Sequence, residues 1–361
     1  MKNSSKPKLF IPGPTHVEDE ILQSMADYPI GHRTPEFSKL YDEIVLHLSK
    51  ILFTTNQIYL CTCSATGLWE AAVRNTVLKR CANFSCGAFS RRWHDVTIMS
   101  GIKADLIEVE LGNPITAELV DKTLASGKYD AITFVHNETS TGVMSPIKDI
   151  AEVMNKYPEV AFLVDMVSSM SSVKVPIDDF GIDVALASVQ KGWAIPPGFS
   201  ICSVSDLALS RSSKCSNKGY YFDFEILEKY AKRSQTPATP SIPHLYALSH
   251  QLKRINSEGL ETRFKRHQDM ARIVQLWAKE RMSLFPDERY ASTTLTCVEN
   301  TLNIDISHLQ TLLLKKGYMI SGGYGPLKGK TFRISHMGDL TPLEINELLK
   351  IIDEIIQEIN T

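Results

Sequence analysis

The feature that most constrains this 361-residue sequence is a series of short β-branched segments that are apolar at consecutive positions, separated by segments with helical spacing. A strand that is apolar on both faces has to be covered on both, as in a mainly parallel sheet between layers of helices. We therefore expect an α/β fold with right-handed strand–helix–strand units. Strands are predicted at residues 57–63, 106–111, 131–136, 160–167 and 184–189, and helices at 67–78, 117–126 and 147–156.

The pattern changes near residue 247. A long helical stretch is predicted over 248–281, then a pair of strands within 293–304, a helix at 307–316 and a strand at 331–335. A last helix begins where Thr341 can act as N-cap, Pro342 takes the first helical position and Glu344 completes a capping box. We expect an N-terminal segment (1–18), a large domain (19–247) and a smaller C-terminal α+β domain (248–361).

Composition excludes several classes of function. The formal net charge is −2, with 43% hydrophobic and 22% charged residues, so nothing favours nucleic acid or an acidic membrane surface as partner. The apolar runs are far shorter than a membrane span, and no apolar stretch follows the basic residues 1–6, so we expect a cytoplasmic protein without a secretion signal. Among seven cysteines, only Cys61 and Cys63 are close neighbours, and no second ligand pair accompanies them. We expect free thiols and no metal site.

Lys191 is the first candidate for chemistry. It ends the buried strand predicted at 184–189 and is followed by Gly192, with Pro196, Pro197 and Gly198 close behind. Burial lowers the pKa of an amine, and a neutral amine is what Schiff-base formation needs. Taken alone, the residue is equally compatible with a lysine that reaches from a strand end into water.

A buried carboxylate is the second candidate. Asp165 lies within the apolar strand predicted at 160–167, where it needs a positive partner. A protonated pyridine nitrogen is such a partner, and keeping it protonated lets the ring accept electrons. The alternative is a structural aspartate that caps a helix.

Two polar segments follow strands. Residues 63–67 bring Ser64 and Thr66 to the start of a predicted helix, which suits a phosphate but equally an ordinary N-cap. Residues 136–142 form a polar cluster after the strand at 131–136. Because ligands of open α/β sheets bind at the carboxyl ends of the strands, these features can converge on one crevice.

Arg333 is the third charged candidate, inside the strand at 331–335 with apolar neighbours. Its planar guanidinium suits a bidentate contact with a carboxylate. An internal salt bridge is the alternative.

In the order and spacing of these motifs, the chain resembles the class V aminotransferases, which are fold-type I pyridoxal-phosphate enzymes. The resemblance runs nearly end to end, and it is nearest to the branch of alanine–glyoxylate, serine–glyoxylate and serine–pyruvate aminotransferases. It is carried by residues 12–15, 32–37, 64–67, 136–142, 164–165, 188–198, 239–243 and 322–333.

The resemblance implies a homodimer, with its active site at the subunit interface, that binds pyridoxal 5′-phosphate in the large domain. Lys191 forms the Schiff base and later moves the substrate proton, while Asp165 pairs with the pyridine nitrogen. The cofactor ring lies between Val167 and Phe89, where many relatives have tryptophan. Thr139 bonds near the phenolic oxygen. The phosphate is held by Ser64, Ala65, Thr66 and Gln190, with Thr239 reaching in from the second subunit.

For the substrate, the resemblance implies that Arg333 binds the α-carboxylate. Gly13 belongs to the N-terminal segment that completes the active site and the small domain. His32 and Arg33 match the pair with which phosphoserine aminotransferases hold the substrate phosphate, and Arg33 alternatively meets a distal carboxylate of aspartate or braces the N-terminal segment.

Two departures from the family pattern bear on function. Alanine–glyoxylate relatives often carry a tyrosine where this chain has Thr236, so part of the phosphate grip differs. Phosphoserine aminotransferases have a basic pair where this chain has Pro326 and Leu327, followed by Lys328. We therefore predict amino transfer from a small amino acid such as serine or alanine to a 2-oxo acid such as glyoxylate or pyruvate, with phosphoserine as the alternative.

Two further hypotheses remain. A desulfurase or other lyase of the same fold needs a mobile cysteine, for which Cys215 in a polar stretch is the candidate, but Phe89 stands where desulfurases usually have histidine. A non-enzymatic binding subunit is the last hypothesis, and Lys191, Asp165 and Arg333 together argue against it.

Overall fold

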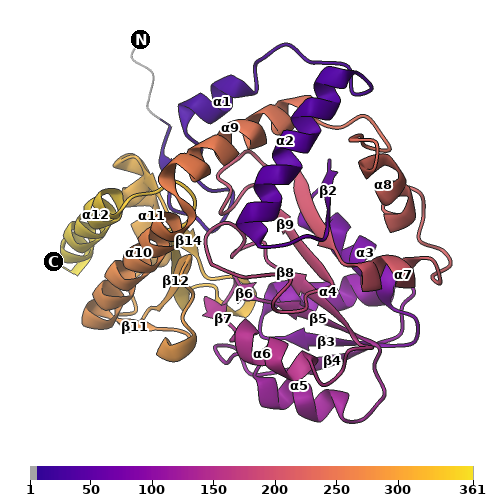
Figure 1. The fold of residues 1–361 in the computed structure, drawn as a ribbon. Helices are drawn as coiled ribbons and strands as arrows, with labels where there is room; N and C mark the ends of the chain where they lie inside the picture. The colour runs from indigo at the N-terminus through magenta and orange to yellow at the C-terminus, as the bar shows by residue number, and fades with distance from the viewer. Residues whose placement is uncertain (1–5, 361) are drawn as a thin grey trace.

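The structure is a computed structural model that describes residues 6–360 (Figure 1). Residues 1–5 and residue 361 lie outside the described residues. The expectation that the basic residues 1–6 begin no secretion signal therefore falls mostly outside the described range. None of the helices in the described range is both long and apolar enough to cross a membrane.

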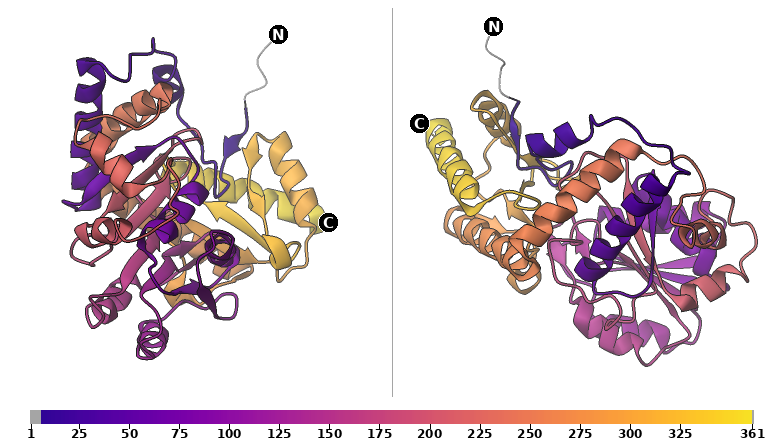
Figure 2. Two further views of the ribbon diagram at one scale, coloured as in Figure 1. Left: turned by 90° about the vertical axis from the view of Figure 1, so that its right-hand side faces the viewer. Right: turned by 45° about the horizontal axis from the view of Figure 1, so that its top comes forward.

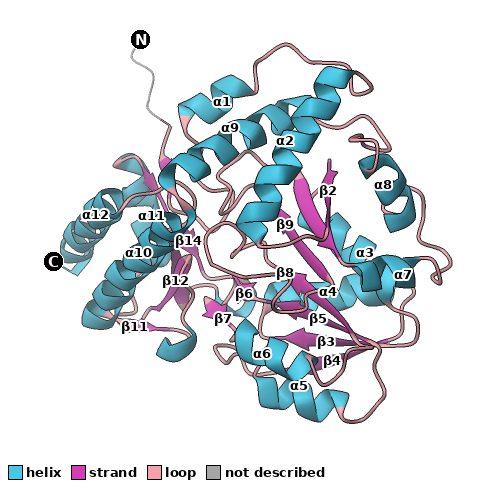
Figure 3. Ribbon diagram, in the orientation of Figure 1, coloured by secondary structure: helices cyan, strands magenta, loops and turns pink. Residues whose placement is uncertain are grey.

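The larger part of the molecule is built on a seven-stranded sheet in the order β2-β10-β9-β8-β5-β3-β4 (Figure 3). All neighbours are parallel except β10, which is antiparallel to both β2 and β9. The strands are β2 (Gln57–Cys61), β3 (Cys81–Ser85), β4 (Ala104–Glu108), β5 (Ala131–Val135), β8 (Ala161–Asp165), β9 (Val184–Ser188) and β10 (Ser200–Val204). The expected α/β fold with a mainly parallel sheet is confirmed.

Helices cover both faces of this sheet, as the doubly apolar strands require. Alternate strand residues point to two separate hydrophobic cores: Phe134 and Phe162 to one, Val135 and Leu163 to the other. The first core is closed by α1 (Asp19–Ser24), α2 (Pro35–Leu52), α5 (Ala117–Leu124), α6 (Ile147–Met154) and α9 (Ile242–Glu258). The second is closed by α3 (Ala65–Thr76), α4 (Ala88–Met99), α7 (Asp206–Ser212) and α8 (Phe224–Ala231).

The C-terminal part carries a four-stranded sheet in the order β11-β12-β15-β14 and packs beside the large sheet (Figure 2). Its strands are β11 (Ser283–Leu284), β12 (Leu295–Glu299), β14 (Ser321–Gly322) and β15 (Thr331–Ser335). They are accompanied by α10 (Leu260–Arg281), α11 (Ile306–Lys315), α12 (Pro342–Asn360) and the short 3₁₀ helices η1 (Glu288–Tyr290) and η2 (Gly325–Leu327). Thr341 and Glu344 form the capping box expected before α12.

Two short strand pairs lie outside the two main sheets. The N-terminal β1 (Lys8–Leu9) pairs in parallel with β13 (Tyr318–Met319) of the C-terminal part. A hairpin of β6 (Asn137–Glu138) and β7 (Val143–Met144) follows β5. The N-terminal segment is thereby fixed to the C-terminal part before it reaches the large sheet.

The stretch predicted as helical over 248–281 is helical, but it is divided between two helices, α9 and α10. Two helices meet at Gly259, whose φ of 83° lies in the left-handed region that ends a helix. The domain boundary at 247/248 stays a prediction. It falls inside α9, which contributes to the core of the large sheet as far as Ile255.

The predicted strand pair at 293–304 was also wrong, because only β12 forms there. Its partners are β11 and β15 instead. The side chain of Asn300 bonds to both the backbone N–H and the carbonyl oxygen of Ile304 and closes a turn after β12. The sequence pattern also missed β3 and β10, which are rich in small polar residues. Buried Asn83 in β3 is satisfied by the hydroxyls of Thr97 and Thr133.

Arg263 is a buried polar link between α10 and the loops that follow β8 and β9. Its guanidinium is 1% exposed and donates to the carbonyl oxygens of Ser171 and Gly192, and it pairs with Glu258 and Asp339. Removing one partner of a buried network leaves the others unpaired.

We predict that Arg263→Met lowers the free energy of unfolding by about 3 kcal/mol, as measured by denaturant titration. Lys265→Ala, which breaks the exposed pair with Asp269 on the same helix, is expected to cost less than about 1 kcal/mol. Equal losses for the two variants would contradict the role given to Arg263.

Candidate active site

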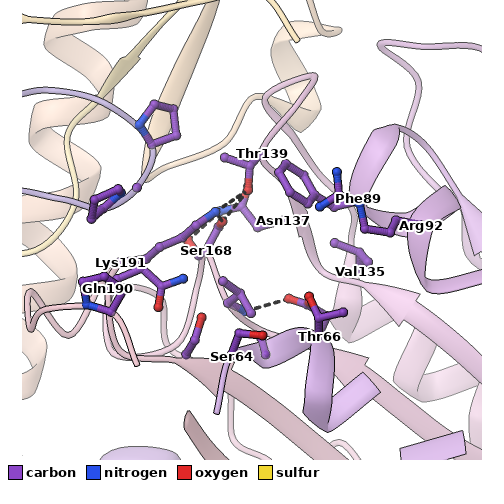
Figure 4. A pocket seen from close by; sticks show the side chains of 18 of the residues that line it. Ser64, Thr66, Phe89, Arg92, Val135, Asn137, Thr139, Ser168, Gln190 and Lys191 are labelled. Atoms are coloured by element: carbon purple, nitrogen blue, oxygen red, sulfur yellow. Dashed lines mark hydrogen bonds between the residues drawn. The ribbon is translucent and has the colours of Figure 1, made fainter. Parts of the chain in front are cut away.

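A cavity of about 360 Å³ opens at the carboxyl ends of the parallel strands, between the large sheet and the C-terminal part (Figure 4). Strands β8 and β9, helices α3 and α4, the N-terminal segment and β15 all contribute to its wall. It brings together eleven of the residues predicted for the site: Gly13, Ser64, Ala65, Thr66, Phe89, Thr139, Asp165, Val167, Gln190, Lys191 and Arg333.

Lys191 lies in this cavity with 8% of its surface exposed. Its Nζ donates to the Oγ1 of Thr139 at 2.8 Å and to the Oγ of Ser168 at 2.9 Å (Figure 4). Burial lowers the pKa of the amine to about 8, although Asp165 and Glu138 offset part of that shift. Near pH 7 a larger fraction of this amine is therefore neutral than for an exposed lysine, although the protonated form still predominates.

Gly13 packs directly on the lysine side chain. A Cβ at this position would lie 3.0 Å from the Cε of Lys191, and the φ of 137° is itself unfavourable for other residues. Glycine thus allows the N-terminal segment to approach the amine closely.

Asp165 ends β8 and is 3% exposed. One carboxylate oxygen accepts the backbone N–H of Val167 at 2.7 Å, and the other accepts the Nε1–H of Trp69 at 2.6 Å. Burial raises the pKa of this carboxyl to about 6, against the effect of both hydrogen bonds. The carboxylate is fixed in position and lines the same cavity as the amine.

The start of α3 offers an anion site. Ser64 is the N-cap residue but makes no side-chain capping bond, so its hydroxyl is not engaged by the helix. Ser64 and Thr66 line the cavity where α3 begins, and Gln190 lines it as well. The first N–H groups of a helix have no partner within the helix. These groups suit a phosphate ester, which needs donors and a positive helix terminus.

Phe89 is positioned by a residue that sequence reasoning did not assign to the site. Buried Glu138 accepts hydrogen bonds from the backbone N–H groups of Phe89, Ser90 and Ser140 and from the hydroxyls of Ser90 and Ser140. A carboxylate at the N-terminus of α4 also meets the positive end of the helix. Gly87 leaves room for it, because a Cβ there would lie 2.5 Å from the Cγ of Glu138.

Arg333 lies in β15 and is 8% exposed. Its Nε donates to the Gly322 carbonyl oxygen and its Nη1 to the Thr139 carbonyl oxygen, each at 3.1 Å. Within residues 6–360 it forms no ion pair, so the alternative of an internal salt bridge does not hold. Burial lowers the pKa of the guanidinium, and its remaining donors are available to a ligand in the cavity.

Three predicted site residues lie elsewhere. Arg33 donates to the carbonyl oxygens of Thr236 at 2.8 Å and Pro237 at 3.3 Å, and its guanidinium lies 5.2 Å from the centre of the Tyr230 ring. His32 precedes it outside the cavity. Thr239 lines a separate small hollow beside Thr62. Within one chain, Arg33 braces the segment that carries Thr239 rather than facing Lys191.

The remaining lining residues were not predicted as site residues. Several follow strands, as Ser168 follows β8, so their proximity to a strand end was the available signal. Others come from helix surfaces or loops that carry no such signal. They are Pro12, Pro14, Trp69, Arg92, Val135, Asn137, Ser168, Ser188, Pro197, Ser321 and Tyr324.

Comparisons with known proteins fit this geometry. The family model of the class V aminotransferases matches residues 81–333. The chain belongs to the class V aminotransferase family. It is 36% identical to an uncharacterized aminotransferase of Methanocaldococcus jannaschii, over 98% of this chain and 94% of the relative. It is 31% identical to the L-aspartate–glyoxylate aminotransferase of Paracoccus denitrificans, over 94% of this chain and 88% of the relative.

Among solved structures, the alanine–glyoxylate aminotransferase of a Nostoc species superposes with a TM-score of 0.92 at 27% identity, covering 99% of this chain and 96% of that one. The protein is a transaminase of fold type I that uses pyridoxal phosphate. The buried amine, the buried carboxylate and the donors at the start of α3 fit the aldehyde, the ring nitrogen and the phosphate of that cofactor.

The pKa of Lys191 leads to a pH dependence. Only the neutral amine reacts with an aldehyde, and its fraction grows as the pH rises toward about 8. In cofactor-free protein, the rate constant for covalent capture of pyridoxal phosphate is therefore predicted to rise with pH and to level off above about 8.

Stopped-flow absorbance across this range measures that rate constant. A rate that still climbs steeply up to pH values typical of an exposed lysine, whose pKa is about 10.4, would contradict a pKa lowered by burial.

Proposed function

We propose that this chain moves an amino group from a small amino acid, such as serine or alanine, to a 2-oxo acid such as glyoxylate or pyruvate. One observation carries the proposal: Lys191, Asp165 and Arg333 line a single cavity together with Ser64 and Thr66 at the start of α3. Glyoxylate is the acceptor named for both the Paracoccus relative and the Nostoc structure, whereas their amino donors differ.

Each residue then has a defined task. Bound pyridoxal phosphate supplies a conjugated ring that accepts electrons from the substrate Cα. Asp165 would keep the ring nitrogen protonated, and Val167 and Phe89 would hold the ring from its two faces. Thr139 would hold the phenolic oxygen side, and Ser64, Ala65, Thr66 and Gln190 would bind the phosphate.

Lys191 has two tasks in the proposal. It would hold the cofactor covalently in the absence of substrate, and as a free amine it would take the proton from the substrate Cα. Its pKa of about 8 suits a general base near neutral pH. Arg333 binds the α-carboxylate, and Gly13 lets the N-terminal segment cover the reacting atoms and exclude water.

The protein is further proposed to act as a homodimer. The segment that carries Thr239 is held by Arg33 at the surface of its own chain. In a dimer with its active site at the subunit interface, this segment would supply Thr239 to the phosphate site of the other subunit. His32 and Arg33 would then reach the neighbouring site together with that segment.

The alternatives are less well supported. A desulfurase would need Cys215 near Lys191, but Cys215 lines a different hollow, and the pKa of its thiol is raised by burial. Phosphoserine transfer would need a basic pair where Pro326 and Leu327 stand, and both of these residues are uncharged.

The amino donor is tested by single-turnover reactions of the purified holoenzyme. Serine and alanine are each predicted to convert the lysine-bound cofactor to its amino form, as measured by the loss of its visible absorption band. Lys191→Ala is predicted to slow Cα proton removal by at least about a thousandfold. Conversion by phosphoserine alone would reverse the order of the two substrate hypotheses.

The dimer is tested by complementation. Thr239→Ala is predicted to weaken cofactor binding about tenfold, because one hydrogen bond to a charged phosphate is lost. A mixed dimer combines one Thr239→Ala subunit with one Lys191→Ala subunit. The first subunit keeps Lys191 and receives Thr239 from the second, so its site should bind the cofactor with wild-type affinity.

Mixed dimers are purified through different tags on the two subunits, and titration with the cofactor measures the dissociation constant of the site that keeps Lys191. Weak binding that persists in the mixed dimer would show that Thr239 does not act across an interface.

A further inference from the structure

Arg92 is a second guanidinium in the wall of the cavity, and the tasks described above do not use it. It lies on α4 three residues after Phe89, so the two side chains share a helix face. The guanidinium carbon lies 5.3 Å from the centre of the Phe89 ring (Figure 4), and Nη2 donates to the Oη of Tyr324 at 2.6 Å.

Tyr324 connects this guanidinium to the carboxylate site. It lies in the loop between β14 and η2, and its ring centre is 5.3 Å from that of Phe89. The guanidinium carbon of Arg333 lies 5.7 Å from the centre of the same ring. Arg333 and Arg92 therefore both contact Tyr324, the first at its ring face and the second at its hydroxyl.

The described residues that line the cavity include more cationic groups than carboxylates. Among the described residues that line it, Lys191, Arg333 and Arg92 are cationic, whereas Asp165 is the single carboxylate. Asp165 already accepts bonds from Trp69 and Val167 and faces the cofactor site. An α-carboxylate satisfies Arg333, which leaves Arg92 without an anionic partner in residues 6–360.

We propose that Arg92, oriented by the hydroxyl of Tyr324, binds the side-chain carboxylate of a dicarboxylic amino acid or of its 2-oxo acid. This inference rests on the proposed function and extends its substrate class to donors such as aspartate. A molecule with two carboxylates would place one on Arg333 and the other on Arg92.

The same geometry admits small donors. Arg92 is exposed at the rim and already has a hydrogen bond to Tyr324 and a contact with the face of Phe89. Leaving its charge unpaired therefore costs little, because water reaches it. A phosphate side chain is less well suited, since one guanidinium has to serve it and the neighbouring residues Pro326 and Leu327 add no charge.

The test compares the holoenzyme with the variants Arg92→Gln and Arg91→Gln. Arg91 is a matched control because it is the next residue on α4, but it pairs with Glu108 and does not line the cavity. Single-turnover rates with L-aspartate, L-alanine and O-phosphoserine are measured. Independently of turnover, calorimetry gives the dissociation constants of succinate and propionate.

Arg92→Gln is expected to lower the second-order rate constant for aspartate by about 10- to 100-fold and to weaken succinate binding by a similar factor. This is the effect of losing one charged hydrogen-bonded contact. Alanine turnover and propionate binding should change less than about threefold. Arg91→Gln should change none of these quantities, and Tyr324→Phe should weaken succinate binding by a smaller factor.

Equal succinate affinity in wild type and Arg92→Gln would overturn the inference, as would Arg92-dependent turnover of phosphoserine without turnover of aspartate. A protein that binds succinate through Arg92 but converts no amino acid would overturn the proposed function and leave the carboxylate site standing.

Discussion

The burial of one amine and one carboxylate in the same cavity is the constraint on which the rest of the site depends. Burial drives the pKa of Lys191 down and that of Asp165 up, and each group partly offsets the shift of the other. Neither charge is stable in an apolar interior without partners. The hydroxyls of Thr139 and Ser168 serve the amine, and Trp69 with the Val167 N–H serves the carboxylate.

The fold provides these partners because parallel strands end on the same edge of the sheet. Asp165 ends β8 and Lys191 follows β9, which are adjacent strands. The helix starts after β2 and β3 bring Ser64 and Phe89 to that edge. The C-terminal part then covers the opening with Arg333. The chemistry therefore depends on the packing of the two parts, which Arg263 holds together beside Lys191.

The sequence was sufficient to predict the α/β fold and to single out charged residues that stand among apolar neighbours. Lys191, Asp165 and Arg333 stood out because a charge in an apolar strand needs a partner, and all three line the cavity. Arg92 and Tyr324 gave no such signal, since an arginine on a polar helix face and a tyrosine in a glycine-rich loop are common on protein surfaces. Glu138 was also missed, because its partners are backbone N–H groups of a helix that is distant in sequence. The break between α9 and α10 at Gly259 was not predicted, because a helical pattern continues on both sides of this residue.

The central claim is that Lys191, and no other lysine of the chain, holds the cofactor covalently beside Asp165. Reduction of the holoenzyme with borohydride, followed by peptide mapping with mass spectrometry, tests it directly. The account predicts one modified peptide per chain, with the cofactor mass on Lys191. Modification of a different lysine, or cofactor that is released unreduced from native protein, would contradict it.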